Sequence, residues 1–328
     1  MQVLVRARAA VAHGEKTAAD LSDAENYMVR RAIQEQLAAG FERVTDGLTR
    51  WSDPISHFAA KLDGVTLGEE RALPSGGNYR VPMLSKRPFR RCPIVADEYR
   101  FACNALGTLN TPVGKAGKLA VKAILTGPFT LAKYSQGSDA SMATIEARTE
   151  AFAAALAAEV AALAESGAEH IQVDEHAPFE PTGEWTLLRT ALSALAAARD
   201  VARKTGRRVE MTLSLAPAGA LAQYDALFEL PIDAIAFDLT HDARLFERLA
   251  SAGAPKPVHL GVVSERESPM EDPHEIARKV ESIMPKIEGT SSLGPAGGLG
   301  SLPRERARAK LDLVARVREI VAGRPVKL

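Results

Sequence analysis

The chain has 328 residues, with 41 basic and 41 acidic side chains, two cysteines, 46% apolar residues and 25% charged residues. The balanced charge, without a long basic tract, excludes the electrostatic footprint of a protein that binds nucleic acid or an anionic membrane. Two cysteines outside any CxxC pair exclude a disulfide-rich scaffold, and the composition is that of an ordinary globular protein.

The amino-terminal segment does not have the pattern of a targeting signal, because Arg6 and Arg8 interrupt its apolar stretch. The most apolar long run, residues 151–164, contains Glu159 and is too short to span a bilayer. We therefore expect a cytoplasmic protein without membrane contact.

Short β-branched or apolar runs alternate with long segments of helical period, which is typical of βα units around a parallel sheet. The predicted strands are residues 3–6, 43–45, 119–125, 170–173, 209–215, 234–237, 258–263 and 291–293. A capping box at residues 22–25 predicts the start of a helix that runs to about residue 39. Further helices are predicted at 144–166 and 184–204, after the N-cap Asp242, after Asp272-Pro273 and from Ser301.

Eight strands with interleaved helices predict one α/β domain over residues 1–328, a single (β/α)8 TIM barrel. A doubly wound open sheet is the structural competitor, but no glycine fingerprint follows the first predicted strand. One region, residues 64–96, is rich in glycine and proline and carries a basic cluster at residues 86–91. We predict an irregular excursion after the second βα unit, either a lid, a subunit contact or a solvated loop.

Active sites of such barrels form at the carboxyl ends of the strands, so polar residues there are the candidates. Asp174 is the first of them, because a charged residue at the end of the apolar run 171–173 is costly to bury without a partner. Its neighbour Glu175 should point toward the helices, since side chains alternate along a strand. Other polar or glycine positions at predicted strand ends are Arg50, His176, Ser214, Asp238, Arg266, Gly297 and Gly298.

The residues at these strand ends are also compatible with two other types of site, a metal site and a phosphate site. Asp174, Asp238 and Glu265 could converge as oxygen ligands for magnesium, calcium or manganese. The glycine-rich loop 294–300 offers backbone N–H groups before a helix, where barrels often hold a phosphate. No HExxH zinc motif and no GxSxG nucleophile motif occurs.

Several of these strand ends resemble one family. The stretch Ile-Leu-Thr-Gly-Pro-Phe-Thr at 124–130 resembles the "TGP" strand end of cobalamin-independent methionine synthase, and Ile-Gln-Val-Asp-Glu at 171–175 resembles its "IQIDE" strand. Asp46-Gly47 with Arg50, then Leu62-Asp63-Gly64, resembles its "DGE…R…LDG" stretch, and the strand ends at 261–263 and 293–299 fall in the same order. The match runs from Glu25 to Val321 and corresponds to the catalytic half of the long enzyme. The superfamily to which this family belongs also includes uroporphyrinogen decarboxylase.

The resemblance implies methyl transfer from 5-methyltetrahydrofolate, or another donor, to a thiol that a zinc ion activates. The zinc ligands of the family, His, Cys, Glu and Cys, fall here on Thr212, Ser214, Asp238 and Gly297. Only Asp238 is a metal ligand by type, so we expect no zinc at this family site. Asp174, which in the family binds the substrate amine, is retained, and Tyr134 replaces a tryptophan that could stack on a pterin-like ring.

We therefore expect a methionine-synthase-like enzyme that transfers a methyl or alkyl group to a small, acidic molecule. A folate-type donor is compatible with it, no metal is assigned, and a homo-oligomer is left open. The expected catalytic residues are Asp174 and Asp238, and the expected substrate-binding residues are Arg50, Tyr134, His176, Ser214, Arg266, Gly297 and Gly298. The alternatives are a zinc-free lyase or decarboxylase, a non-catalytic binding barrel, and a conventional methionine synthase whose zinc is held by Cys92 and His176.

Overall fold

The computed structural model describes residues 2–74, 76–109, 119–180, 183–266 and 269–323. Within these ranges the main sheet has seven parallel strands in the order β1-β4-β6-β7-β8-β9-β10, and a smaller sheet has the order β2-β3-β5. The strands of the main sheet are β1 (Arg43–Val44), β4 (Ala120–Thr126), β6 (His170–Glu175), β7 (Glu210–Leu215), β8 (Ala234–Asp238), β9 (Val258–Val263) and β10 (Ser292–Pro295).

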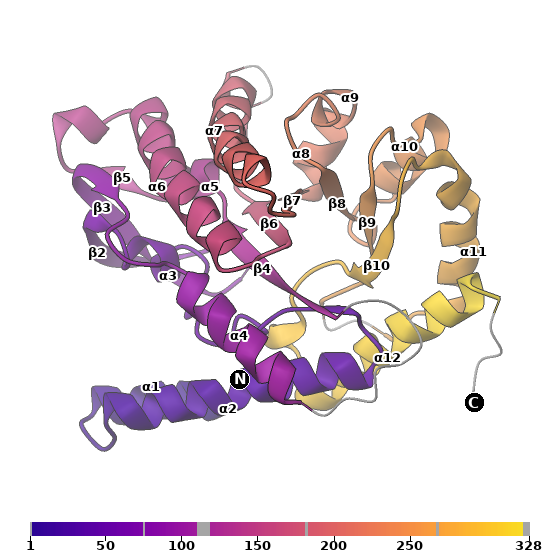
Figure 1. The fold of residues 1–328 in the computed structure, drawn as a ribbon, viewed down its shortest axis with the longest axis horizontal. Helices are drawn as coiled ribbons and strands as arrows, with labels where there is room; N and C mark the ends of the chain where they lie inside the picture. Colours follow the sequence, from indigo (N-terminus) through magenta and orange to yellow (C-terminus); the bar gives the residue numbers. More distant parts are fainter. Residues whose placement is uncertain (1, 75, 110–118, 181–182, 267–268, 324–328) are drawn as a thin grey trace.

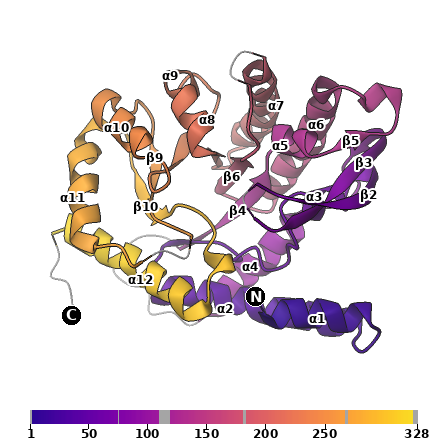
Figure 2. The same cartoon turned by 180° about the vertical axis from the view of Figure 1, so that it is seen from behind.

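Helices surround this sheet in an arc, with α6, α7, α8, α10 and α11 along one side and α12, α2 and α4 closing toward the other (Figures 1 and 2). None of the helices within the described ranges is long and apolar enough to cross a membrane. The helices are α1 (Gln2–Ala12), α2 (Ala18–Ala38), α3 (Ser56–Ala59), α4 (Ala96–Thr108), α5 (Pro128–Lys133), α6 (Ile145–Glu165), α7 (Glu184–Lys204), α8 (Pro217–Ala222), α9 (Tyr224–Leu227), α10 (Ala243–Ala252), α11 (Pro273–Ile283) and α12 (Arg304–Val321).

The sheet is curled into a half-barrel and differs from the closed eight-stranded barrel that we predicted. Strands β1 and β10 end the strand order, and the described residues contain no pairing between them. The predicted first strand, residues 3–6, belongs to α1, where Leu4 and Ala7 are buried while Val3 and Val5 are 54% and 57% exposed. Burial at a spacing of three is the period of a helix, and the alanines and arginines around the two valines favour one.

The other seven predicted strands are confirmed as β1, β4 and β6 to β10, with small shifts at their ends. The start of α2 differs from the prediction, because the capping box lies at Thr17 and Asp20 rather than at residues 22–25. The Asp20 side chain accepts a hydrogen bond from the Thr17 backbone at 2.8 Å, and the Thr17 hydroxyl accepts one from the Asp20 backbone at 3.2 Å. Helices α1 and α2 pair as a hairpin whose turn projects away from the sheet (Figures 1 and 2).

The segment predicted to be irregular, residues 64–96, is mostly an antiparallel hairpin of β2 (Asp63–Ala72) and β3 (Asn78–Phe89). Strand β3 also pairs in parallel with β5 (Gln136–Gly137). Glycines and prolines hid the alternation of Tyr79 and Val81, which are both buried. Three of the four basic residues in the cluster form ion pairs, Arg87 with Glu150, Arg90 with Glu159 and Arg91 with Asp63.

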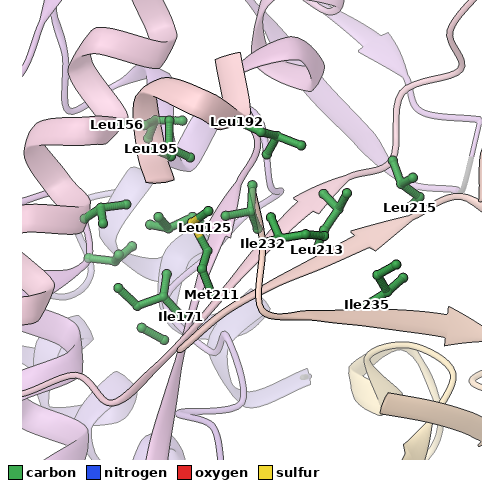
Figure 3. Packing of buried hydrophobic residues seen from close by; sticks show 14 of the residues in the cluster. Leu125, Leu156, Ile171, Leu192, Leu195, Met211, Leu213, Leu215, Ile232 and Ile235 are labelled. Atoms are coloured by element: carbon green, nitrogen blue, oxygen red, sulfur yellow. The ribbon is translucent and has the colours of Figure 1, made fainter. Parts of the chain in front are cut away.

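The apolar core lies between the outer face of the curled sheet and the helices. Figure 3 shows Leu125, Ile171, Met211 and Leu213 of successive strands packing toward Leu192 of α7. These strand residues are 0–1% exposed, and they alternate with polar residues that face the other way. The alternation therefore places a polar inner face opposite an apolar outer face.

Candidate functional site

At the amino ends of the strands, the inner face carries a layer of charged side chains, whereas typical barrels fill their interior with branched apolar residues. Glu210 of β7 lies at its centre, 3.5 Å from His170 Nδ1, 3.7 Å from His259 Nε2 and 3.7 Å from an Arg43 guanidinium nitrogen. The contacts with His170, His259 and Arg43 hold the pKa of Glu210 well below its usual range. Burial lowers the pKa of His259. The layer therefore holds an ionised carboxylate among neutral and cationic partners.

A chain of hydrogen bonds connects this layer to the carboxyl ends of the strands. The Lys122 ammonium donates to the Gln172 side-chain oxygen, and the Gln172 amide donates to Asp174 Oδ1 at 2.7 Å. Burial lowers the pKa of Lys122 to about 8, against the opposing effect of the Asp174 carboxylate. Asp174 is thus fixed in orientation by Gln172, with a cationic residue beneath it.

Asp174 lies at the carboxyl end of β6, as predicted, beside two other predicted site residues. It is the register partner of Ser214 on β7. The ring nitrogen Nε2 of His176, in the loop after β6, lies 3.2 Å from the Ser214 hydroxyl oxygen. Three predicted residues are therefore gathered at one strand-end edge, and His176 is exposed there.

The neighbouring carboxylate, Glu175, points to the helix side, as expected from strand alternation. It accepts hydrogen bonds from the backbone N–H groups of Phe129 at 3.0 Å and Thr130 at 2.7 Å, and from the Thr130 hydroxyl at 2.6 Å. Burial raises its pKa to about 7 despite these bonds. A Cβ at Gly127 would collide with the Glu175 carboxyl group, so glycine is required at this turn. Glu175 thus fixes α5 over the end of β4 next to Asp174.

A second cluster lies at the ends of β8 and β9. Asp238 ends β8, His241 follows in the next loop, and Glu265 follows β9. One potential ligand atom from each of these three residues lies within 4.8 Å of the others. Gly297, after β10, lies against Glu265, since a Cβ there would be 3.1 Å from Glu265 Cγ. The structure therefore brings together two of the three carboxylates that we expected to converge on a metal, Asp238 and Glu265, with His241 in the place of Asp174.

Arg50 lies apart from the inner face. Its guanidinium donates to Asn26 Oδ1 at 2.5 Å and to Glu25 Oε2 at 3.3 Å, both on α2. Its guanidinium carbon also lies 5.0 Å from the ring centre of Phe101 on α4. Through these contacts, Arg50 connects α2 to α4.

The other predicted binding residues have different surroundings. Tyr134 follows α5, and its ring meets Tyr79 edge-on, with ring centres 5.3 Å apart. Arg266 is 72% exposed, and its Nε lies 3.9 Å from Glu265 Oε1. Gly298 is exposed in the loop after β10. Arg266 and Gly298 thus lie on the rim near Glu265, and Tyr134 faces the smaller sheet.

The four positions to which the resemblance assigns zinc ligands carry two hydroxyls, one carboxylate and one glycine. The Thr212 hydroxyl contacts His259 Nε2 at 3.1 Å, and the Ser214 hydroxyl contacts His176. Hydroxyls are weak zinc donors and glycine at 297 offers no side chain, so one carboxylate remains of four expected ligands. Cys92 is exposed, and the metal-ligand cluster found among the described residues contains neither it nor His176.

Several residues of the inner face were missed in the sequence, although a signal was present. His-x-Gln-x-Asp at 170–174 and Glu-x-Thr-x-Ser at 210–214 place polar residues at every second position of otherwise apolar strands. That period of two marks a polar face along the whole strand, not only at its end. His241 follows Asp238 by three residues, a spacing that lets one side chain contact the other.

Residues 2–319 match the sequence model of a family described as "Cobalamin-independent synthase, Catalytic domain". A methionine synthase of Saccharolobus solfataricus is 25% identical over 300 residues, covering 91% of this chain and 84% of that relative. A methionine synthase of Methanothermobacter marburgensis is 27% identical over 300 residues, covering 88% and 87%. Among solved structures, a B12-independent methionine synthase from Shewanella sp. W3-18-1 in complex with selenomethionine is similar with a TM-score of 0.75 and 19% identity, covering 94% of this chain and 90% of that one.

Proposed function

Because the chain belongs to the family of cobalamin-independent synthase catalytic domains, we propose that it transfers a methyl or alkyl group between small molecules. We further propose that it does so without the family's four-ligand zinc site. The observation that carries this proposal is the strand-end edge of Asp174, Ser214 and His176, beside positions where hydroxyls and a glycine replace zinc ligands. The fold alone does not determine which reaction the protein catalyses.

Asp174 is the residue proposed to bind the acceptor. Its carboxylate, oriented by Gln172, would hold a cationic group such as a substrate ammonium. His176 lies on the same edge and would take up the proton that a nucleophilic acceptor loses when it receives the alkyl group. Asp238 would assist from the end of β8, next to the exposed loop of Gly297 and Gly298.

A folate-type molecule is the proposed donor. Its acidic tail would meet Arg266 at the rim, where that guanidinium is 72% exposed. Tyr134 follows α5 beyond the end of β4 and is half-buried, and we propose that its accessible face stacks on the donor ring. Arg50 is left out of this proposal, because its partners lie on α2 and α4.

A zinc-free decarboxylase or lyase is the second candidate, and Lys122 is the observation that favours it. This buried ammonium lies below Asp174 on the inner face, and its pKa of about 8 would suit an acidic substrate bound deeper than Asp174. A substrate that loses carbon dioxide would then depend on Lys122 more than on His176. The two candidates therefore predict different sensitive residues.

Ligand binding tests the proposal through Asp174. We expect 5-methyltetrahydrofolate and amino-acid acceptors to raise the melting temperature of the wild-type protein. Asp174→Asn should weaken acceptor binding about tenfold or more, because a charge-assisted hydrogen bond contributes about 1.5–3 kcal/mol. Asp225→Asn, which alters an exposed aspartate on α9, is the matched control and should bind like the wild type.

Two results would contradict the proposal. Equal acceptor affinity in wild type and Asp174→Asn would show that the site lies elsewhere. A thermal-shift screen in which no donor or acceptor stabilises the wild type would instead favour a non-catalytic protein.

A further inference from the structure

The cluster of Asp238, His241 and Glu265 stands on two neighbouring strands of the half-barrel. Asp238 is the register partner of Gly261 on β9, which places the loop after β8 beside the loop after β9. The side chains of Asp238, His241 and Glu265 are 13%, 16% and 25% exposed. The cluster is thus largely shielded, with one side toward the rim.

Asp238 fixes the orientation of His241. Its Oδ1 accepts hydrogen bonds from the Thr240 backbone and hydroxyl, both at 2.8 Å, and its Oδ2 contacts His241 Nδ1. This contact at Nδ1 turns the ring so that Nε2 points away from Asp238 and toward Glu265. Metal-binding histidines usually have such a carboxylate on their other nitrogen.

The Nε2 atom of His241 faces Glu265 without a hydrogen bond between them. It lies 3.3 Å from Glu265 Oε1, yet His241 Nε2 and Glu265 Oε2 are shielded from solvent and lack a hydrogen-bond partner among the described residues. A shielded ring nitrogen and a shielded carboxylate oxygen that lack hydrogen-bond partners cost free energy. A cation bound by both side chains would satisfy them.

The room for Glu265 comes from Gly297. A Cβ at that position would lie 3.1 Å from Glu265 Cγ, so the glycine allows the Glu265 side chain to lie along the loop after β10. Gly297 and Asp238 are also positions to which the resemblance assigns zinc ligands. Glu265 and His241 therefore supply metal-ligating atoms next to positions that have lost them.

We propose that His241 Nε2 and the Glu265 carboxylate bind one divalent transition-metal ion, with Asp238 positioning His241. An imidazole nitrogen combined with carboxylate oxygens suits manganese, iron, cobalt or zinc better than magnesium or calcium, which prefer oxygen alone. Two protein ligands leave coordination positions open on the rim side for water or a substrate atom. The proposal concerns binding of the metal alone, so it stands or falls independently of the transferred group.

Cobalt binding, measured on the full-length protein without substrate, tests this site. We expect stoichiometric Co²⁺ after desalting and a visible absorption band typical of nitrogen ligation. His241→Ala and Glu265→Gln should each weaken Co²⁺ binding by about tenfold to a hundredfold or more, and Asp238→Asn should weaken it less. Thr212→Val should leave the affinity unchanged, which separates this site from the family's zinc positions.

Matched controls come from α11. His274→Ala and Glu275→Gln remove the same side-chain types from exposed positions and should bind Co²⁺ like the wild type. Circular dichroism checks that each variant is folded, and Glu265→Gln keeps the test valid if His241→Ala does not fold. The proposal is overturned if the wild type binds none of Co²⁺, Mn²⁺ or Zn²⁺, or if neither variant changes the affinity.

Discussion

At the scale of single residues, adjacent carboxylates on β6 have separate roles because a strand alternates its faces. Asp174 points to the polar inner face, where Gln172 orients it. Glu175 points to the helices, where it accepts three hydrogen bonds from the start of α5. Substitutions of Glu175 should therefore change stability first, whereas substitutions of Asp174 should change binding first.

The buried carboxyl group of Glu175 makes a pH-dependent contribution to stability. Its folded-state pKa is raised from 4.5 to about 7, so the folded protein holds a proton that the unfolded chain releases. The contribution is full below pH 4.5 and decreases as the pH rises toward about 7. Urea unfolding of wild type and Glu175→Gln across this interval should show their difference in unfolding free energy decreasing with pH. A difference that increases with pH would contradict the assignment.

The position of Asp174 on the polar inner face at the end of β6 was predictable from the sequence, because a charged residue at the end of an apolar run needs a partner. The position of Arg50 was not, since its partners Glu25 and Asn26 come from a helix whose packing no local pattern reveals. The pairing of His241 with Glu265 likewise depends on two loops from adjacent strands. Sequence patterns thus located the strand-end edge, while contacts between distant segments determined which side chains face each other.

At the scale of elements, Glu159 of α6 connects the excursion to the body of the protein. It is fully buried, accepts hydrogen bonds from the backbone N–H groups of Val95 and Ala96 at 2.7 Å each, and pairs with Arg90. The carboxylate therefore caps the start of α4 and holds the end of the β2–β3 hairpin. In the sequence, Glu159 was noted only as a charged residue within the apolar run 151–164.

Glu159→Gln should lower the free energy of unfolding by about 3 kcal/mol, because it leaves Arg90 without its buried partner. Glu150→Gln is the matched control on the same helix. Glu150 forms an ion pair with Arg87 in which both side chains are exposed, so Glu150→Gln should lower the free energy of unfolding by about 0.5 kcal/mol or less. Equal effects of both variants in chemical unfolding would show that Glu159 does not hold α4.

The elements themselves were largely predictable where the periodic pattern was long. Helix α6 begins at its Thr144 cap, and the Asp242 and Asp272 caps are confirmed. The first predicted strand was wrong because two valines outweighed a helical spacing of Leu4 and Ala7. The hairpin of β2 and β3 was missed because Gly and Pro usually interrupt strands, although β3 contains two prolines.

At the scale of the whole molecule, an open half-barrel explains why the inner face carries charges. In a closed barrel this volume is dry and packed, whereas here the layer around Glu210 contains partly exposed polar side chains. The apolar core lies instead outside the sheet, against the helices (Figure 3). Within the described ranges, strands β1 and β10 are the two edges of the sheet.

Hydrogen exchange distinguishes the open sheet from a closed barrel. Backbone amides of the central strands β6 and β7 should be protected longest from exchange. Each of these strands is paired with a neighbouring strand on both sides, and helices cover their outer face. Peptides that contain β1 and β10 should exchange faster, since each strand has one neighbour among the described residues. Equal protection of these edge strands and the central strands would indicate that the barrel closes in solution.

Transfer of a labelled methyl group tests most directly whether this family member has left zinc-dependent homocysteine chemistry. The protein is mixed with ¹³C-methyl-labelled 5-methyltetrahydrofolate, homocysteine and a panel of other small amine and carboxylate acceptors, with added zinc, and the products are analysed by mass spectrometry. We predict labelled product from an acceptor other than homocysteine, and its loss in Asp174→Asn. Labelled methionine formed in a zinc-dependent reaction would contradict the proposed function, as would the absence of any labelled product or a labelled product that Asp174→Asn leaves unchanged.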